Sequence, residues 1–135
     1  MDKVIDEFLL QRFGKDSLIA LATQEGGVPS VRAVNAVYTD GAFYCVTYLK
    51  SNKMRQIEKS DTVGLCGEWF TGHGRGENLG WICAEENEAL AAKLREAFAS
   101  WYQNGHVNEE DENTIILKII LTDGVVFSNG KRYEF

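Results

Sequence analysis

Residues 42–57, AFYCVTYLKSNKMRQI, place a short basic segment directly behind a strand of apolar and aromatic residues. The segment that begins at Ser51 predicts a helix start, with Ser51 as the N-cap residue. Lys53 falls in the first turn of that helix, so free backbone N–H groups, a hydroxyl and an ammonium meet at one place. This combination is suited to binding a phosphate.

A second cation, Arg32, lies on the strand that precedes this strand and helix start. Residues 39–41, Thr-Asp-Gly, predict a tight turn, so the strands at 30–38 and 42–49 form a hairpin. The hairpin can bring the guanidinium of Arg32 beside the helix start at Ser51. A phosphate there would meet the planar fork of an arginine and the point charge of a lysine together.

The remaining patterns predict a small antiparallel barrel of six or seven strands with inserted helices, rather than a doubly wound sheet. The run of glycines at 71–80 excludes a long regular helix there. Residues 107–113 form an acidic loop, which we interpret as solvated surface. The predicted helices are 4–13, 51–60 and 85–103, and the strands are 18–23, 30–38, 42–49, 62–70 and 114–121, followed by short strands separated by turns at Asp123-Gly124 and Asn129-Gly130.

Length and charge limit the classes of function. The 135 residues fit one domain, 1–135. Asp and Glu number 20 against 14 Lys and Arg, and this excess of negative charge disfavours a general nucleic-acid binder. Apolar runs such as 18–22 are too short to span a membrane, and the first residues lack the apolar core of a signal peptide. We therefore expect a cytoplasmic protein.

The three cysteines show no C-x-x-C spacing and sit among apolar or aromatic neighbours, so we expect buried thiols. A zinc site built from Cys66, His73, Cys83 and His106 is an alternative, but these spacings match no common zinc module. No metal site is therefore predicted. No carboxylate pair or nucleophile triad is legible either, so the sequence names no catalytic residue.

The ordered set of features resembles the pyridoxamine 5′-phosphate oxidase-related, FMN-binding split-barrel family. The set comprises a strand with Arg32, a turn at Asp40-Gly41, the aromatic strand 43–48, the helix start at 51–53, Gln56-Ile57, and a following strand at 63–66. The resemblance covers residues 18–69, with weaker agreement over the final strands. It implies an antiparallel split β-barrel of the FMN-binding type.

By this resemblance, Arg32, Ser51 and Lys53 hold the phosphate of FMN. Family members commonly carry a second basic residue where this chain has Asn52, and Lys50 or Arg55 are the residues that can compensate. The resemblance also places further residues near the cofactor: Ala33, Val34 and Asn35 beside the isoalloxazine ring, and Thr47 and Tyr48 near the ribityl chain.

The family is typically homodimeric, with flavin at the subunit interface. Residues of the second subunit would then complete each site, and the candidates around the glycine-rich segment are Trp69, His73, Asn78 and Trp81. Core or interface packing is the alternative for the tryptophans. His73 is a candidate proton donor near a flavin nitrogen, and the alternative for it is an ordinary loop residue.

The resemblance implies a flavin-dependent oxidoreductase that acts on a small molecule. The chain ends without the longer, basic carboxy-terminal portion of the family's true oxidases, so oxidation of pyridoxamine phosphate is not expected. The alternatives are a non-catalytic flavin carrier or sensor, a related split barrel that binds haem or a deazaflavin, and a cofactor-free interaction domain.

Overall fold

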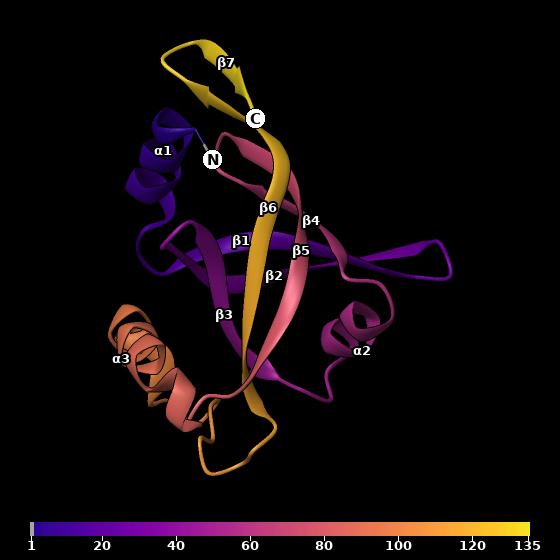
Figure 1. Cartoon of the computed structure of the whole chain (residues 1–135), viewed down its shortest axis with the longest axis vertical. Coiled ribbons are helices and arrows are strands. Elements are labelled where there is room, and N and C mark those ends of the chain that lie inside the picture. The colour runs from indigo at the N-terminus through magenta and orange to yellow at the C-terminus, as the bar shows by residue number, and fades with distance from the viewer. Residues whose placement is uncertain (1) are drawn as a thin grey trace.

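Antiparallel strands form a single seven-stranded sheet that closes into a barrel (Figure 1). The computed structural model describes residues 2–135. Its elements are α1 (Lys3–Phe13), β1 (Ser17–Glu25), β2 (Val28–Thr39), β3 (Ala42–Tyr48), α2 (Asn52–Lys59), β4 (Thr62–Gly67), β5 (Phe70–Trp81), a 3₁₀ turn η1 (Glu85–Asn87), α3 (Glu88–Ala97), α4 (Ala99–Tyr102), β6 (Thr114–Ser128) and β7 (Lys131–Glu134).

The strand order is β3-β2-β1-β4-β5-β6-β7. A further pairing of β3 with β6 closes the ring over six strands and leaves β7 as an extension beside β6. Closure removes the exposed edges that an open antiparallel sheet would present. The predicted fold class, a mainly β split barrel with inserted helices, is confirmed.

The barrel interior is filled by apolar side chains from alternate strand positions, and α1 covers it from one side (Figure 1). Leu9 and Phe13 of α1 are buried in this core. The Phe13 ring lies 5.6 Å from that of Phe43 and 5.7 Å from that of Phe70, measured between centroids. The helix predicted at 4–13 is thus confirmed as α1.

The glycine-rich segment is not a loop but the strand β5, in which Gly72, Gly74 and Gly76 alternate with exposed residues and so lie on one, buried side. Gly74 and Gly76 are buried on the inner side. A Cβ atom at Gly74 would lie 2.7 Å from the backbone oxygen of Ile120, and one at Gly76 would lie 3.0 Å from Cγ2 of Ile57. The missing side chains therefore let β6 and α2 lie directly against β5.

The strand β6 continues through Asp123-Gly124, so the turn predicted there is wrong. Its pairing with β5 shifts register at this point and leaves Thr122 as an extra residue, which is a β-bulge rather than a chain reversal. The turn predicted at Asn129-Gly130 is confirmed, with positive φ angles at both residues. The predicted strand at 62–70 also divides, because β4 ends at Gly67 and β5 begins at Phe70.

A second apolar cluster lies outside the barrel, between β3, β6 and the helices α3 and α4. Ile116 of β6 and Leu94 and Phe98 of the helices are completely buried there. The strand β6 is therefore covered on both faces, by the barrel core on one side and by these helices on the other. The single helix predicted at 85–103 is interrupted, because Phe98 ends α3 and precedes α4.

The helices of this fold are short. The longest, α1, has 11 residues. In the part of the chain that the structure describes, no helix has both the length and the apolar character that crossing a membrane requires.

Candidate functional site

Two cations from different elements meet where α2 follows β3. Arg32 is a half-buried residue of β2, and its Nη1 donates a hydrogen bond to Oγ1 of Thr23 at 2.7 Å. Lys53 lies half-buried in the first turn of α2, close enough to Arg32 for the two charges to repel. Among residues 2–135, neither cation forms an ion pair with a carboxylate.

The surroundings of these cations work against their charged forms. Burial lowers the pKa of Lys53, and the charge of Arg32 lowers it further, against an opposing effect of the Cys45 thiol. Burial also lowers the pKa of Arg32. Cys45 remains a neutral thiol, because burial raises its pKa to about 12. A pair of partly buried cations without a counter-charge is a site that an anion would stabilise.

Ser51 supplies the third group of the predicted phosphate site. It occupies the N-cap position of α2 as predicted, but its side chain makes no capping bond to the helix. Its Oγ is buried and has no hydrogen-bond partner in the part of the chain that the structure describes. A buried polar atom without a partner is uncommon and costs free energy. Ser51 therefore fits a role as a hydrogen-bonding group for a ligand at the start of α2.

Two buried polar residues, for which the sequence predicted no role, join this arrangement. Thr23 of β1 donates from its hydroxyl to Oε1 of Gln56, on α2. Both side chains are buried, with Thr23 2% and Gln56 7% exposed. The signal that could have found them is a polar residue inside an otherwise apolar face, Thr23 after the run at 18–22 and Gln56 between Met54 and Ile57.

Lys50 and Arg55, the cations proposed to compensate for Asn52, differ in whether they have an ion-pair partner. Arg55 forms an ion pair with Glu25, with a second contact to the same carboxylate at 2.7 Å. Arg55 also approaches Oδ1 of Asn52 at 3.5 Å. Lys50 makes no ion pair with any residue that the structure describes. Of the two, Lys50 is the cation left available.

The three residues expected beside the flavin ring do not share one side of β2. Val34 packs against the barrel core, whereas Ala33 is exposed on the other face. Asn35 donates from Nδ2 to Oδ1 of Asp16 at 3.0 Å. A ligand on one face of this strand would therefore not meet all three side chains.

Thr47 and Tyr48, expected near the ribityl chain, lie at the end of β3 just before Ser51. They line a pocket of about 240 Å³ together with residues of the loop at 106–111. The backbone N–H of Ser51 donates to the oxygen of Tyr48 at 3.1 Å, so the N-cap of α2 adjoins a residue that lines this pocket. The contribution of the loop at 106–111 was not foreseen in the sequence.

Within this chain, Trp69 and His73 do not contact Arg32 or Lys53. Trp69 occupies the turn between β4 and β5, where its backbone oxygen accepts from Arg12 of α1, and its side chain is 66% exposed. His73, on β5, approaches Oδ1 of Asp123 through Nδ1 at 2.8 Å. Among the residues described, neither forms a hydrogen bond or ion pair with Arg32, Ser51 or Lys53, and their contribution from a second subunit stays a prediction.

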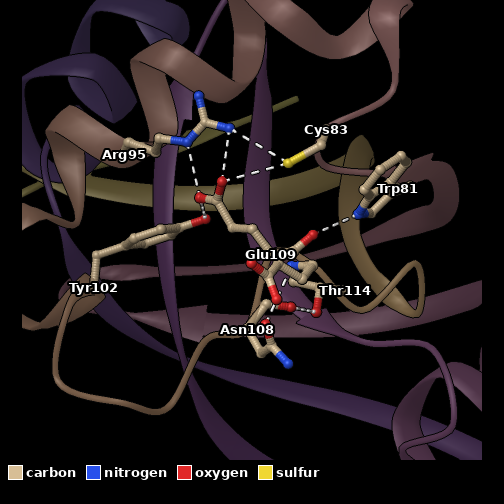
Figure 2. A network of polar contacts seen from close by, with 8 residues as sticks. Trp81, Cys83, Arg95, Tyr102, Asn108, Glu109 and Thr114 are labelled. Atoms are coloured by element: carbon tan, nitrogen blue, oxygen red, sulfur yellow. Dashed lines mark hydrogen bonds and ion pairs between the residues drawn. The ribbon is translucent and has the colours of Figure 1, made fainter.

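Trp81 belongs to a separate polar cluster that fastens the acidic loop (Figure 2). The carboxylate of Glu109 accepts from Nε and Nη2 of Arg95 at 2.8 and 2.9 Å, and from the hydroxyl of Tyr102 at 2.6 Å. Its backbone oxygen accepts from Nε1 of Trp81 at 2.8 Å. Chiefly through Arg95, the pKa of Glu109 is lowered to about 2. The acidic segment is therefore an anchored loop and not only solvated surface, as we had interpreted it.

The structure places the cysteines differently from the prediction of buried thiols. Cys45 is buried, but Cys66 and Cys83 are exposed. Cys83 contacts the Glu109 cluster, with its Sγ 3.4 Å from Oε1 of that residue (Figure 2). Among the residues described, no three or more His, Cys, Asp or Glu side chains cluster as metal ligands, so the zinc alternative gains no support from the fold.

Comparison with known proteins identifies the fold through solved structures. No protein-family model matches the chain, and neither does any curated protein sequence. A FAD-binding protein from Mesorhizobium loti aligns with a TM-score of 0.68 at 13% identity, over 90% of this chain and 91% of its own. A haem-binding protein from Mycobacterium smegmatis aligns with a TM-score of 0.72 at 13% identity, over 100% of this chain and 58% of its own.

A third similar structure is that of a protein provisionally assigned as a pyridoxamine 5′-phosphate oxidase from Listeria innocua. It aligns with a TM-score of 0.65 at 12% identity, over 94% of this chain and 99% of its own. At such low identities the likeness concerns the fold. The chain thus has the split-barrel fold of the pyridoxamine 5′-phosphate oxidase-like proteins, as its resemblance to them implied.

Proposed function

We propose that this chain binds FMN and acts as a flavin-dependent oxidoreductase on a small molecule, with the cofactor phosphate held by Arg32, Ser51 and Lys53. The observation that carries the proposal is the set of groups at the start of α2. Two partly buried cations lack a counter-charge, and a buried hydroxyl beside them lacks a partner. A phosphate monoester supplies both the negative charge and the acceptor oxygens that these groups lack.

The rest of the cofactor would lie along the groups that adjoin this site. Thr47 and Tyr48 line the pocket next to Ser51, and Ala33 follows Arg32 on β2. When bound, the flavin would supply the redox chemistry, while the protein would supply binding, orientation and the electrostatic surroundings. A FAD-binding protein with this fold supports the choice of a flavin.

We also propose that the protein is a homodimer, in which the second subunit completes each flavin site. The outer face of β2, β1 and β4 is made of small apolar residues. Val31 pairs with Ala22 and Ala22 with Gly64, while Ala33 pairs with Ala20 in the next row. Val31 is 68% exposed in the single chain. Such a flat apolar face is suited to packing against a second sheet.

The test compares FMN with riboflavin, which lacks the phosphate. We expect the wild type to bind FMN more tightly than riboflavin by at least about 100-fold, because charged hydrogen bonds contribute about 1.5–3 kcal/mol each. The double variant Arg32→Gln/Lys53→Met should lose this preference. Arg55→Gln is the matched control, because Arg55 lies on the same helix but is already paired with Glu25. Quenching of flavin fluorescence measures both affinities.

A wild type without affinity for FMN, or a double variant that keeps the preference, would refute the phosphate site. The colour of protein purified from cells separates the alternatives. Flavin absorbance at about 450 nm favours a flavoprotein, and a Soret band favours the haem-binding alternative. Oxidation of a reduced nicotinamide with steady turnover of an acceptor then distinguishes the oxidoreductase from a flavin carrier or sensor.

A further inference from the structure

We propose that Thr23 and Gln56 are positioning residues of the anion site. In this inference, the single buried hydroxyl of Thr23 orients the guanidinium of Arg32 and joins α2 to β1, so that the cations of β2 and α2 face one phosphate. The inference rests on the proposed function, because it concerns how that phosphate site is built. It adds two residues that do not touch the ligand themselves.

The Thr23 hydroxyl makes two hydrogen bonds, one to β2 and one to α2. A threonine hydroxyl has one proton to donate and two lone pairs that accept. Here the proton goes to Oε1 of Gln56, and a lone pair accepts from Nη1 of Arg32 at 2.7 Å. Because Thr23 is only 2% exposed, water does not replace either bond. One side chain of β1 therefore connects β2 with α2.

The guanidinium of Arg32 is held through one of its nitrogens, Nη1. All the hydrogen bonds that hold Arg32 leave from Nη1, to Thr23 and more weakly to the backbone oxygens of Leu21 at 3.3 Å and Ser30 at 3.4 Å. Nε and Nη2 donate to no residue in the part of the chain that the structure describes. Since the guanidinium is planar and rigid, fixing Nη1 fixes the direction of the free edge. That edge is the one available for an anion.

The placement of α2 depends on the other bond of this hydroxyl, the one to Gln56. Gln56 is the one polar side chain of α2 that is buried, and its neighbours Met54 and Ile57 pack into the apolar core. An apolar residue would satisfy packing at this position without a partner on β1. The hydrogen bond between the Gln56 side-chain amide and Thr23 instead fixes the rotation of the helix that carries Ser51 and Lys53 at its start. The orientation of Arg32 and that of α2 therefore depend on the same hydroxyl.

The experiment uses the isosteric variant Thr23→Val, which removes the hydroxyl and keeps the shape. We expect the affinity for FMN to fall about 10- to 100-fold, as loss of a hydrogen bond to a charged group predicts, while the affinity for riboflavin stays the same. Thr23→Ser restores the hydroxyl and should restore the preference for FMN. If Thr23→Val proves unable to fold, Gln56→Met takes its place. It removes the acceptor at similar side-chain length and should likewise lower the ratio of FMN to riboflavin affinity.

Gln24→Ala is the matched control. Gln24 also joins β1 to α2, through a 3.2 Å hydrogen bond from its Nε2 to Oγ of Ser60, but it does not contact Arg32. Its loss should leave the ratio of FMN to riboflavin affinity unchanged. Equal losses of FMN and riboflavin affinity in Thr23→Val would show a merely structural role and overturn the inference, as would an unchanged ratio. A wild type that does not prefer FMN would instead refute the phosphate site itself.

Discussion

At the scale of single residues, the cations of the proposed anion site lower the stability of the ligand-free folded chain. Arg32 and Lys53 are held close together without a carboxylate between them, and burial lowers the pKa of both. A group whose charged form is disfavoured by the fold destabilises the folded chain while it stays charged. Functional sites commonly contain such unfavourable arrangements, and substitutions there can stabilise a protein while they abolish its function.

We therefore expect Lys53→Met to stabilise the ligand-free protein by about 0.5–1 kcal/mol at neutral pH. The pKa of Lys53 in the folded chain is lower than in the unfolded chain, so the unfolded chain binds its proton more tightly. The destabilising contribution is complete below the lowered pKa and disappears as the pH rises to the ordinary lysine value. Urea denaturation of both proteins at neutral and alkaline pH measures the gain and its decline.

Arg55→Met provides the comparison for this prediction. Arg55 lies on the same helix but is paired with Glu25, so its removal should cost a small amount of stability instead of adding any. A Lys53→Met protein that is less stable than the wild type at neutral pH would contradict the interpretation of Lys53 as an unpaired, disfavoured cation.

The residues of the candidate site differ in how well the sequence predicted them. Arg32, Ser51 and Lys53 were predicted as one set because a helix start behind a strand is a local pattern, and a hairpin was expected to bring the arginine to it. In the structure β2 pairs with β3 only at residues 37–39, and Arg32 lies opposite Leu21 of β1. Thr23 and Gln56 received no role, because their bond joins residues 33 positions apart. Nothing in the sequence states that these two side chains meet inside the barrel.

At the scale of elements, the carboxylate of Glu109 anchors the loop between α4 and β6 to the helices. Glu109 accepts from Arg95 of α3 and from Tyr102 of α4, and this loop lines the pocket beside Thr47 and Tyr48 (Figure 2). The contact connects the helices outside the barrel to the wall of the pocket. A change in the charge of Glu109 should therefore alter both the stability and the shape of this region.

We expect the wild type to lose stability as the pH falls from about 4.5 to about 2, and Glu109→Gln to lose less over the same interval. The pKa of Glu109 is lowered from 4.5 to about 2 in the folded chain, chiefly by Arg95. Its contribution is therefore present above the unfolded pKa and disappears as the carboxylate is protonated. For this partly exposed pair we expect a difference of about 1–2 kcal/mol in unfolding free energy.

Thermal unfolding followed by circular dichroism at several pH values measures this difference. Glu110→Gln serves as the control, because it neutralises the adjacent carboxylate of the same loop, for which the structure shows no ion pair among the residues described. Parallel pH profiles of the wild type and Glu109→Gln would contradict the anchoring role of Glu109.

Helices and strands were predicted correctly where hydrophobic periodicity was present, and the predictions were wrong where it was absent. The amphipathic pattern located α1, and the apolar run at 114–121 located most of β6. The strand β5 carries glycines on its inner face, so it shows no apolar alternation although it pairs with both neighbours. Asp123-Gly124 has the composition of a turn, but pairing with β5 holds the chain extended and a bulge absorbs the extra residue.

At the scale of the whole molecule, the two faces of the barrel wall differ in how they are covered. The outer side of β3 and β6 is buried under α3 and α4, whereas the outer side of β2, β1 and β4 carries apolar residues without a cover in the single chain. Leu18 and Val31 on this side are each 68% exposed. A symmetric dimer would bury this face against its copy.

We expect the double variant Leu18→Lys/Val31→Lys to be monomeric at micromolar concentrations at which the wild type is a dimer. Two added charges on each copy would face one another across a desolvated surface, which is strongly unfavourable. The control Val4→Lys/Leu10→Lys alters exposed apolar residues of α1, 47% and 48% exposed, and should remain dimeric. Sedimentation velocity distinguishes the two states.

The same variant also separates the two halves of the proposed flavin site. If the second subunit completes the site around the ring, the monomer should lose affinity for FMN and for riboflavin to a similar extent. The residues proposed to bind the phosphate belong to one chain, so the preference for FMN over riboflavin should survive in the monomer. A wild type that sediments as a monomer would exclude the interface, and a monomeric variant with undiminished affinity for both flavins would place the whole site within a single chain.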